Sequence, residues 1–451
     1  MEKIMEIVII GGIAAGMSAA AKAIRTNKEA IVTVIEKANY ISFGACGLPY
    51  YLGDQFKDEQ EMFARTPEQM KATGIQLMLE HEVTSIDFEN KELKITNLKT
   101  KQTLTKSYDR LLIATGSTPI VPKIKGLNMK AKNIYTIDTP GHVQQLKEQL
   151  DNYQNILIIG GGFIGLEVAD QLAQKNKQIQ LLEANKTVVN VPFDPEFSEK
   201  IAEAVTKKGV NMYFEEVAQE MIFKEDNVIS VKTTKREFQV DAVIMAVGVT
   251  PNTAFVAGQL DMLTINGAII IDDYGRTSIP DVFAAGDCAK INHRLAGTMY
   301  IPLATTANKL GRIVGENLVV KEENMHTYSG SLASIAIKAG DYEAAATGIN
   351  ETKAKELELN YKTTCIETMN HSNYYSTQEK IMIKLVYDAD TFVLYGAQLF
   401  GKNETVLRAT AFSTAIYAGL TTKELGFVDY AYAPPFASTW EAINVAANTA
   451  K

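Results

Sequence analysis

One cysteine near the start of the chain stands among small residues. Cys46 lies in the stretch SFGACGLPYY, with two glycines and an alanine beside it. The other cysteines, Cys288 and Cys365, lie far along the chain and are expected to be small packed side chains. Small neighbours let two reactants approach one sulfur, and a thiolate is the nucleophile of disulfide exchange. The stretch therefore indicates redox or exchange chemistry at Cys46.

The residues after this cysteine read CGLPYYLGD and are predicted to begin a helix. A thiol at the start of a helix has its thiolate form favoured by the helix dipole. We therefore expect Cys46 to be a reactive thiol rather than a packing residue.

A dinucleotide-binding motif occurs in the middle of the chain. Gly160, Gly162 and Gly165 satisfy G-x-G-x-x-G between a predicted strand and a predicted helix. Such glycines allow a tight turn, close approach of a pyrophosphate, and close packing of helix on strand. Glu183 ends the next predicted strand, where an acid binds a ribose 2′-hydroxyl and repels a 2′-phosphate. NADH is therefore favoured, and Lys186 keeps NADPH possible.

The N-terminus carries the same motif in a weaker form. Gly11 and Gly16 hold the first and third positions, Ile13 replaces the middle glycine, and Glu36 ends the next predicted strand. Alone, this could be a strand–helix–strand unit whose glycine only packs the helix. A chain with two dinucleotide units usually holds one cofactor permanently and exchanges the other. The permanently bound cofactor would be FAD.

The stretch AAGDCA supports a flavin site. Asp287 follows Gly286 at the end of a predicted strand. An acid there could hydrogen-bond the sugar-alcohol chain of a flavin, and the alternative is a turn residue that caps the next helix.

Patterns of apolar residues give the elements that hold these motifs. Short apolar runs that enter glycine turns are typical of parallel strands. Strands are expected at 6–10, 31–36, 179–183 and from 155, and within 108–119, 240–252 and 277–289; helices follow both glycine turns and span 301–319. After about residue 325, meander strands within 332–349 and 380–401 and a helix over 403–419 indicate an α+β domain.

Composition limits the class of protein. A chain of 451 residues with 46% hydrophobic and 22% charged residues predicts two or three soluble globular domains. The net charge of −8 has no clustered basic face, so we expect no nucleic-acid partner. We expect no transmembrane helix, because no long uncharged apolar run occurs. Three scattered cysteines indicate a reducing cytoplasm.

Together, the two glycine turns, ATGSTP, AAGDCA and the C-terminal region resemble the pyridine nucleotide–disulfide oxidoreductases over essentially the whole chain. The resemblance implies an α/β fold with two Rossmann-like domains and a homodimer. It implies an FAD domain from residues 1–118 and 248–324, an NAD(P)H domain at 119–247, and a dimerisation domain at 325–451. The implied cofactor-binding residues are Gly11, Gly12, Ala15, Gly16, Glu36, Lys37, Ser42, Ala114, Thr115, Gly116, Gly160, Gly162, Phe163, Ile164, Gly165, Glu183, Gly248, Gly286, Asp287, Pro302, Leu303 and Ala304.

The stretch around Cys46 is similar to the single-cysteine branch of that family. This branch contains coenzyme A-disulfide reductases, NADH oxidases, NADH peroxidases and NADH-dependent persulfide or polysulfide reductases, and it implies a redox cysteine beside the flavin. Ala14 stands where oxidases and peroxidases typically carry a histidine. Tyr374 and Tyr375 in SNYYS and Tyr432 in AYAPPF match tyrosines that reach the partner subunit's cysteine in coenzyme A-disulfide reductases. These features favour the reductases.

The resemblance also implies contacts with coenzyme A and a reaction cycle. Arg25, Ser42 and Lys71 match positions near that ligand, although ATG follows Lys71 where more positive charge is expected. Electrons would pass from NADH through FAD to Cys46, held as a mixed disulfide or a sulfenic acid, and a tyrosine would protonate the leaving thiolate. The alternatives are a water-forming NADH oxidase or peroxidase and a redox-sensing flavoprotein, and the reactive cysteine argues against the sensor.

Overall fold

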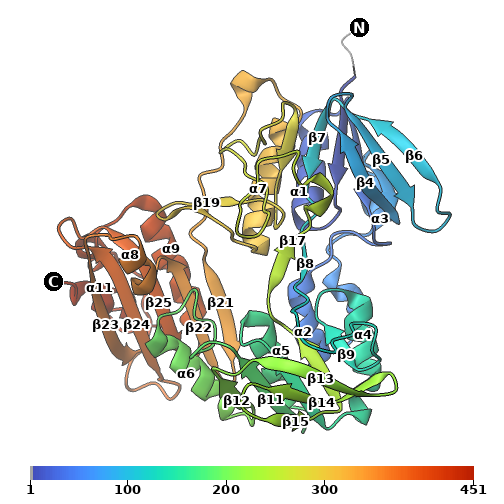
Figure 1. The fold of residues 1–451 in the computed structure, drawn as a ribbon. Coiled ribbons are helices and arrows are strands. Elements are labelled where there is room, and N and C mark those ends of the chain that lie inside the picture. The colour runs from blue at the N-terminus through green and yellow to red at the C-terminus, as the bar shows by residue number, and fades with distance from the viewer. Residues whose placement is uncertain (1–3) are drawn as a thin grey trace. The chain divides into compact units, whose positions relative to one another are not determined.

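Two units of structure make up the chain, which is described here by a computed structural model for residues 4–451. The first unit takes residues 4–47 together with Lys57–Ile120 and Val249–Ser331. The second takes Leu48–Phe56, Val121–Gly248 and Leu332–Lys451. The chain therefore leaves the first unit directly after Gly47, one residue beyond Cys46. Figure 1 follows the chain by colour from blue to red.

A parallel sheet is the centre of the first unit, in the order β18-β7-β1-β2-β3. Its inner strands are almost entirely buried, as expected for a sheet covered on both faces. The chain order reverses at β1, and ligands of such sheets bind at the carboxyl ends of the strands near that point. The strand bounds are β1 Glu6–Ile10, β2 Ile31–Glu36, β3 Gln76–Leu79, β7 Arg110–Ile113 and β18 Val282–Ala284.

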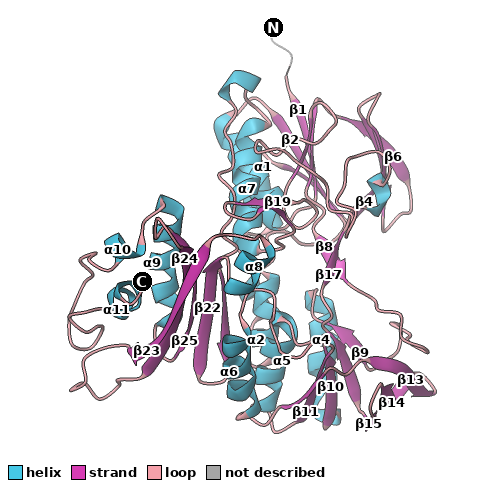
Figure 2. Cartoon of the chain, turned by 60° about the vertical axis from the view of Figure 1, so that its left-hand side comes forward, coloured by secondary structure: helices cyan, strands magenta, loops and turns pink. Residues whose placement is uncertain are grey.

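Two helices of this unit, α1 (Ala14–Thr26) and α7 (Ala304–Asn317), lie side by side (Figure 2). A Cβ atom on Gly311 would lie 2.4 Å from the Ala15 carbonyl oxygen, so only glycine permits this close approach. The remaining elements are α3 Pro67–Lys71, the antiparallel strands β4 His81–Asp87, β5 Glu92–Asn97 and β6 Thr103–Ser107, and the strand pairs β8 Ser117–Pro119 with β17 Val249–Pro251 and β19 Ile291–His293 with β20 Gly297–Met299.

The second unit repeats the strand–helix–strand arrangement of the first. Its parallel sheet has the order β12-β11-β10-β16-β9, with α5 joining β10 to β11. Short α2 packs on α5 and α4 within this unit. The bounds are α2 Leu48–Leu52, β9 Ile134–Thr136, α4 Pro140–Gln149, β10 Asn155–Ile159, α5 Phe163–Ala173, β11 Gln178–Glu183, α6 Pro195–Thr206, β12 Asn211–Phe214, β13 Ala218–Lys224, β14 Asn227–Thr233, β15 Glu237–Gln239 and β16 Ala242–Met245.

The C-terminal part of the second unit is an antiparallel sheet in the order β21-β22-β25-β24-β23, with α9 packed on β22 and β25. This confirms the predicted α/β class with a C-terminal α+β domain. The small antiparallel sheets β4–β6 and β13–β15 were not predicted, because half of their side chains face solvent and interrupt the apolar runs. The bounds are β21 Ile335–Ala339, β22 Tyr342–Gly348, α8 Glu351–Glu356, β23 Tyr361–Met369, β24 Lys380–Asp388, β25 Leu394–Gly401, α9 Thr405–Ala418, α10 Thr422–Leu425 and α11 Ala442–Asn448.

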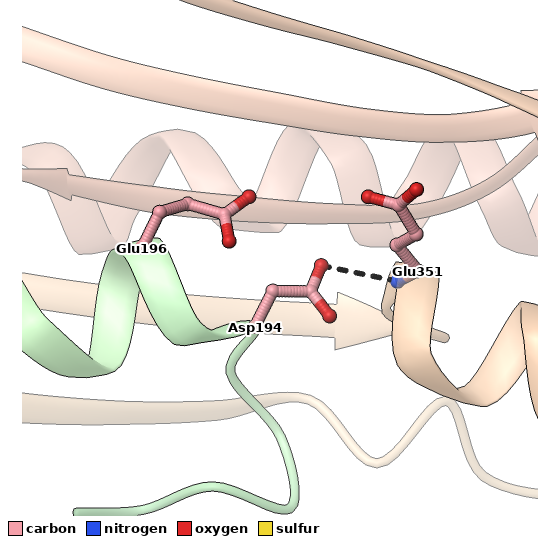
Figure 3. Close-up of side chains that lie close together, drawn as sticks. All are labelled: Asp194, Glu196 and Glu351. Atoms are coloured by element: carbon pink, nitrogen blue, oxygen red, sulfur yellow. Dashed lines mark hydrogen bonds between the residues drawn. The ribbon is translucent and has the colours of Figure 1, made fainter. Parts of the chain in front are cut away.

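An acidic cluster joins α6 and α8 to this sheet (Figure 3). Oxygens of Asp194, Glu196 and Glu351 lie within 4.8 Å of one another, close enough to hold a metal ion. The Lys384 ammonium lies 3.0, 2.5 and 2.6 Å from these three carboxylates. Burial lowers the pKa of Lys384, but hydrogen bonds and charge from the carboxylates outweigh it and raise this pKa overall. One lysine cation therefore occupies the centre of the cluster and offsets part of its negative charge.

Replacing Lys384 with methionine should destabilise the protein by about 3 kcal/mol, because it leaves carboxylates without their buried cation. Lys380 on the same strand pairs with Glu367 at an exposed position, so Lys380→Met is the matched control and should leave the free energy of unfolding nearly unchanged. Urea unfolding of both variants measures the difference. Equal effects of the two substitutions would contradict a structural role for the cluster.

Candidate active site

The first glycine turn follows β1 and is shaped by contacts with the neighbouring strand. Gly11 has φ +106°, and a Cβ there would lie 2.1 Å from the Ala114 carbonyl oxygen. A Cβ on Gly16 would lie 1.9 Å from the Gly11 carbonyl oxygen. Both glycines are therefore required for α1 to start directly over the sheet, where its N-terminal N–H groups can face an anion.

The buried carboxylate of Glu36 holds this turn in place. One of its oxygens accepts a hydrogen bond from the Gly12 N–H at 2.7 Å, and the other accepts from the Ala38 N–H at 2.8 Å. The predicted ribose contact of Glu36 stays a prediction. Each oxygen can still accept a further bond, so bracing the turn and binding a ribose are compatible.

The second turn uses the same device. Gly160 has φ +113°, and Glu183 accepts hydrogen bonds from the Gly161 N–H at 2.7 Å and the Asn185 N–H at 2.7 Å. A Cβ on Gly162 would meet no atom within 4 Å, so this position is open to a ligand. This is the space that a pyrophosphate needs in order to approach the backbone.

The loop that carries the thiol is joined to the first turn. The Ser42 N–H donates to the Gly12 carbonyl at 3.0 Å, and Ser42 has φ +52°. The Gly44 N–H donates to the Met62 carbonyl at 2.8 Å. Cys46 is exposed at the end of this loop, in a 3-10 turn over Ala45–Gly47.

The prediction that a helix begins at Cys46 is wrong. The regular helix α2 begins at Leu48 and has only five residues. Such a short helix has a small dipole, so the predicted stabilisation of a thiolate by a helix N-terminus does not apply. Pro49 follows the turn and fits the first helical positions, where its missing N–H is tolerated.

Three polar side chains of the first unit, Asp287, Ser117 and Tyr300, are suited to bind a flavin. Burial raises the pKa of Asp287, and the hydrogen bond from the Ser117 hydroxyl, at 3.1 Å, only partly opposes it. The Tyr300 hydroxyl is buried and has no hydrogen-bond partner within residues 4–451. Such groups need polar partners, and the sugar-alcohol chain of FAD would supply them. The alternative role of Asp287, as the cap of the next helix, does not apply, because the hairpin β19–β20 comes before α7. Its predicted flavin contact stays a prediction.

Other predicted cofactor residues lie at the carboxyl ends of the strands. Thr115, before β8, and Asn252, directly after β17, exchange two hydrogen bonds, at 2.7 and 3.0 Å. Their pairing with each other is a feature that the sequence did not indicate. For the remaining residues of this group, cofactor contact stays a prediction: Ala15, Lys37, Ala114, Gly116, Phe163, Ile164, Gly248, Gly286, Pro302, Leu303 and Ala304.

Two of the three predicted tyrosines lie together in the second unit. The Tyr374 and Tyr432 hydroxyls are 3.2 Å apart, and both residues are exposed. This hydrogen bond lowers the pKa of Tyr374 and raises that of Tyr432. Tyr375 instead packs edge-to-face on His371, with the ring centres 5.6 Å apart. The structure thus brings two of the three predicted tyrosine hydroxyls together, and the proton-donor role of all three stays a prediction.

A cavity of about 420 Å³ lies beside the end of α1 and contains the predicted Arg25. Lys28 also lines it, together with Thr73 and the acidic Glu29. Lys71 lies close in sequence but is not one of the lining residues. Sequence analysis missed Lys28, which lies just after the end of α1. Nothing in the order of residues shows that this segment meets Thr73, in the segment after α3.

The two remaining cysteines differ in exposure. Cys288 is buried, as predicted, and its thiol donates to the Ile113 carbonyl at 3.3 Å. Cys365 is exposed on β23, so its predicted role as a small packed side chain is wrong. Alternating strand positions face opposite sides, which the sequence pattern could not assign here.

Two dinucleotide turns, with an exposed thiol on the loop that one of them holds, define a redox enzyme with two dinucleotide cofactors. The chain belongs to the pyridine nucleotide-disulphide oxidoreductase family, which it matches over residues 5–311, and residues 336–443 match the family's dimerisation domain. It is an NAD(P)H-dependent flavoprotein oxidoreductase of the NADH oxidase or coenzyme A-dependent sulfur reductase kind. Membership of this family implies FAD binding, which agrees with the polar surround of Asp287, Ser117 and Tyr300 in the first unit.

Relatives of both kinds match the chain along almost its whole length. An NADH oxidase of Enterococcus faecalis is 33% identical, with 99% of each chain covered. A coenzyme A polysulfide/persulfide reductase of Pyrococcus horikoshii is 34% identical over 99% of this chain and 98% of its own.

Solved structures give the same division. The water-forming NADH oxidase from Lactobacillus brevis bound to NADH has a TM-score of 0.94 and 32% identity, covering 99% of this chain and 98% of its own. The reduced CoADR-RHD protein of Bacillus anthracis has a TM-score of 0.95 and 31% identity, covering 99% of this chain and 80% of its own. Among residues 4–451, no helix combines the length and apolar character needed to span a bilayer.

Two glycines of the second turn should respond differently to alanine. Gly162→Ala should fold normally, because its Cβ has open space, but should weaken NADH binding about tenfold or more by occupying the place of the pyrophosphate. Gly165→Ala should instead destabilise the protein by about 1–3 kcal/mol, because its Cβ would lie 2.0 Å from the Gly160 carbonyl oxygen.

Thermal unfolding and NADH titration of each variant provide the measurement. Unaltered NADH affinity in Gly162→Ala would show that the cofactor does not approach the backbone at this turn.

Proposed function

We propose that this enzyme transfers electrons from NADH through FAD to Cys46 and reduces coenzyme A disulfide or a similar low-molecular-weight disulfide or persulfide. The observation that carries the proposal is the exposed Cys46 on a loop joined to the first glycine turn, together with the Arg25–Lys28 cavity on the helix that the same turn begins. The loop that carries the thiol and the residues that line the basic cavity both belong to the first unit, which supports the proposal.

The length of α1 suits an elongated ligand. Arg25 lies eleven residues after Ala14, which corresponds to about 16 Å along a helix. Coenzyme A carries its phosphates at one end and its sulfur at the other end of an extended arm. Phosphates at Arg25 and Lys28 and a sulfur at Cys46 would use both ends of α1. Ser42, also predicted near coenzyme A, lies on the loop that carries Cys46 and donates through its N–H to the Gly12 carbonyl, just before α1.

The chain's own residues account for the exchange step. The Cys46 thiolate attacks one sulfur of the disulfide, the sulfur–sulfur bond breaks, and a thiolate leaves while a mixed disulfide forms on Cys46. Tyr432, paired with Tyr374, gives the leaving thiolate its proton. FAD, when bound, would accept a hydride from NADH and supply the two electrons that release the second thiol and restore Cys46. Overall, one NADH and one proton convert one disulfide into two thiols.

A homodimer completes this arrangement. The C-terminal domain exposes large apolar side chains, which a second copy would cover: Leu407, Tyr417, Phe427, Phe436 and Trp440. The proposed donor is Tyr432 of the partner subunit, as the family resemblance implies.

The cofactor preference follows from Glu183. Its carboxylate lies at the end of β11, where a ribose 2′-hydroxyl could donate to it and a 2′-phosphate would be repelled. NADH is therefore the proposed donor. Lys186 is the residue that would permit some use of NADPH.

A water-forming NADH oxidase is the second candidate, favoured by the relatives of that name. In that reaction Cys46 would take one oxygen atom of peroxide as a sulfenic acid and release water, and NADH would supply the electrons that restore the thiol. Overall, two NADH and two protons convert one dioxygen into two water molecules.

The variant Cys46→Ser should separate the two candidates from a structural role of the thiol. It should bind FAD and be reduced by NADH, and lose disulfide reduction almost completely, because serine cannot form a mixed disulfide. Any remaining oxygen consumption should release hydrogen peroxide instead of water.

Steady-state turnover with coenzyme A disulfide and with oxygen, alongside a peroxide assay, tests this. Normal disulfide turnover by the variant would show that Cys46 is structural.

Arg25 should affect only disulfides that carry phosphates. Arg25→Ala should raise the KM for coenzyme A disulfide about tenfold, the loss of one charge-assisted contact, and leave the KM for pantethine unchanged. Pantethine has the same sulfur end without the nucleotide phosphates. Lys71→Ala is the matched control and should have a smaller effect, because Lys71 does not line the cavity. An equal rise for both substrates would argue against phosphate binding there.

A further inference from the structure

The helix that follows the reactive thiol is fastened to its neighbours by several polar contacts. The Tyr51 hydroxyl donates to Gln144 Oε1 at 2.9 Å. Lys147 Nζ donates to the Tyr51 carbonyl at 2.6 Å and lies 3.7 Å from the centre of the Tyr51 ring. α2 is thus held by α4 of the second unit, although the chain joins it to Cys46 through Gly47 alone.

The residues just after α2 continue this attachment. Asp54 forms ion pairs with Lys147, at 2.8 Å, and with Lys175, and both lysines lower the pKa of Asp54. Gln55 Nε2 donates to Gln171 Oε1 at 3.0 Å. The whole segment 48–56 is therefore tied to α4 and to the helix of the second dinucleotide turn, α5.

One contact includes a group that titrates near neutral pH. The Tyr50 hydroxyl donates to Glu167 Oε1 at 3.0 Å. Glu167 lies on α5, in the second turn after the open Gly162. Burial raises the pKa of Glu167 to about 7, and the Tyr50 hydrogen bond lowers it in part. An ionised carboxylate accepts a stronger hydrogen bond than a protonated one, so this contact strengthens as pH rises through about 7.

Other charged groups around α5 are engaged elsewhere. Asp54 faces from the segment after α2 and pairs with the two lysines named above. Asp170, one turn further along α5, accepts a hydrogen bond from the Gly340 N–H at 3.1 Å and is influenced by Lys208 and Lys338. Burial and Tyr50 are the causes of the shift at Glu167, and none of these charged groups contributes to it.

We propose that Glu167 and Tyr50 are positioning residues for Cys46: the charge of Glu167 sets how firmly α2 is held, and α2 sets the position and reactivity of the thiol before it. This inference rests on the part of the proposed function that makes Cys46 the reactive thiol. It does not depend on whether the electron acceptor is a disulfide or oxygen.

The test is the rate of alkylation of Cys46 by iodoacetamide in the FAD-loaded enzyme, followed by peptide mass spectrometry between about pH 5.5 and pH 9. The wild-type profile should show the ionisation of the thiol and a second inflection near pH 7, with a rate change of about fivefold across the latter. Cys365 is exposed and serves as the reference thiol in the same sample, and its profile should lack the second inflection.

Two substitutions should remove the second inflection. Glu167→Gln keeps an oxygen that accepts the Tyr50 hydrogen bond but cannot ionise. Tyr50→Phe keeps the ring but cuts the connection to α2. Tyr51→Phe is the matched control, because it removes a hydrogen bond of the same helix to the non-titrating Gln144, and it should keep the inflection.

A wild-type profile without the second inflection, or an inflection that survives in Glu167→Gln, would overturn the proposal. So would an equal effect of Tyr50→Phe and Tyr51→Phe. The flavin spectrum reports whether each variant is folded, and the isosteric Glu167→Gln keeps the test decisive if Tyr50→Phe loses FAD. A Cys46 that never reacts faster than Cys365 would overturn both this inference and the proposed function, whereas turnover with the wrong acceptor would affect only the latter.

Discussion

Both cofactor turns depend on one interaction, a buried carboxylate that accepts a hydrogen bond from the turn's own backbone. Glu36 holds the Gly12 N–H and Glu183 holds the Gly161 N–H, each at 2.7 Å. Burying a charged carboxylate is costly unless hydrogen-bond donors satisfy it, and backbone N–H groups at the carboxyl edge of a parallel sheet do so here. The carboxylates add to the backbone hydrogen bonds that the Gly11 and Gly160 N–H groups donate to Ile35 and Leu182 of the next strands, both at 2.8 Å.

The loop that carries the thiol is connected to the same carboxylate, Glu36, through the backbone of Gly12. Gly12 donates through its N–H to Glu36 and accepts through its carbonyl from the Ser42 N–H. One peptide segment therefore connects the end of β2, the cofactor turn and the loop that carries Cys46. A change in the position of the acid would alter both the cofactor turn and the start of the thiol loop.

The sequence predicted the structure correctly where only one residue type can occupy a position. The glycine spacing predicted both turns because a Cβ at Gly11 or Gly160 would collide with a neighbouring carbonyl. It failed where partners come from distant segments. Thr73 and Gly74 complete the cavity at Arg25, and Tyr50 donates a hydrogen bond to Glu167. Both contacts join segments that lie far apart in the chain, and no local pattern encodes them.

The short segment after Cys46 illustrates a further limit. The sequence CGLPYYLGD predicted a helix that begins at Cys46. The helix α2 that forms has only five residues, and contacts with α4 and α5 stabilise it rather than its own helix propensity. The position of Cys365 was also wrong, because a β-strand exposes alternate residues and one cysteine does not reveal the phase.

The two turns differ at the middle position of the glycine motif. Ile13 occupies the position before α1 that Gly162 occupies before α5. The first turn thus carries a side chain at this position, whereas a Cβ on Gly162 in the second turn would meet nothing within 4 Å. The two turns therefore share the carboxylate brace and differ at the middle position, where the second leaves the space that a pyrophosphate needs to approach the backbone.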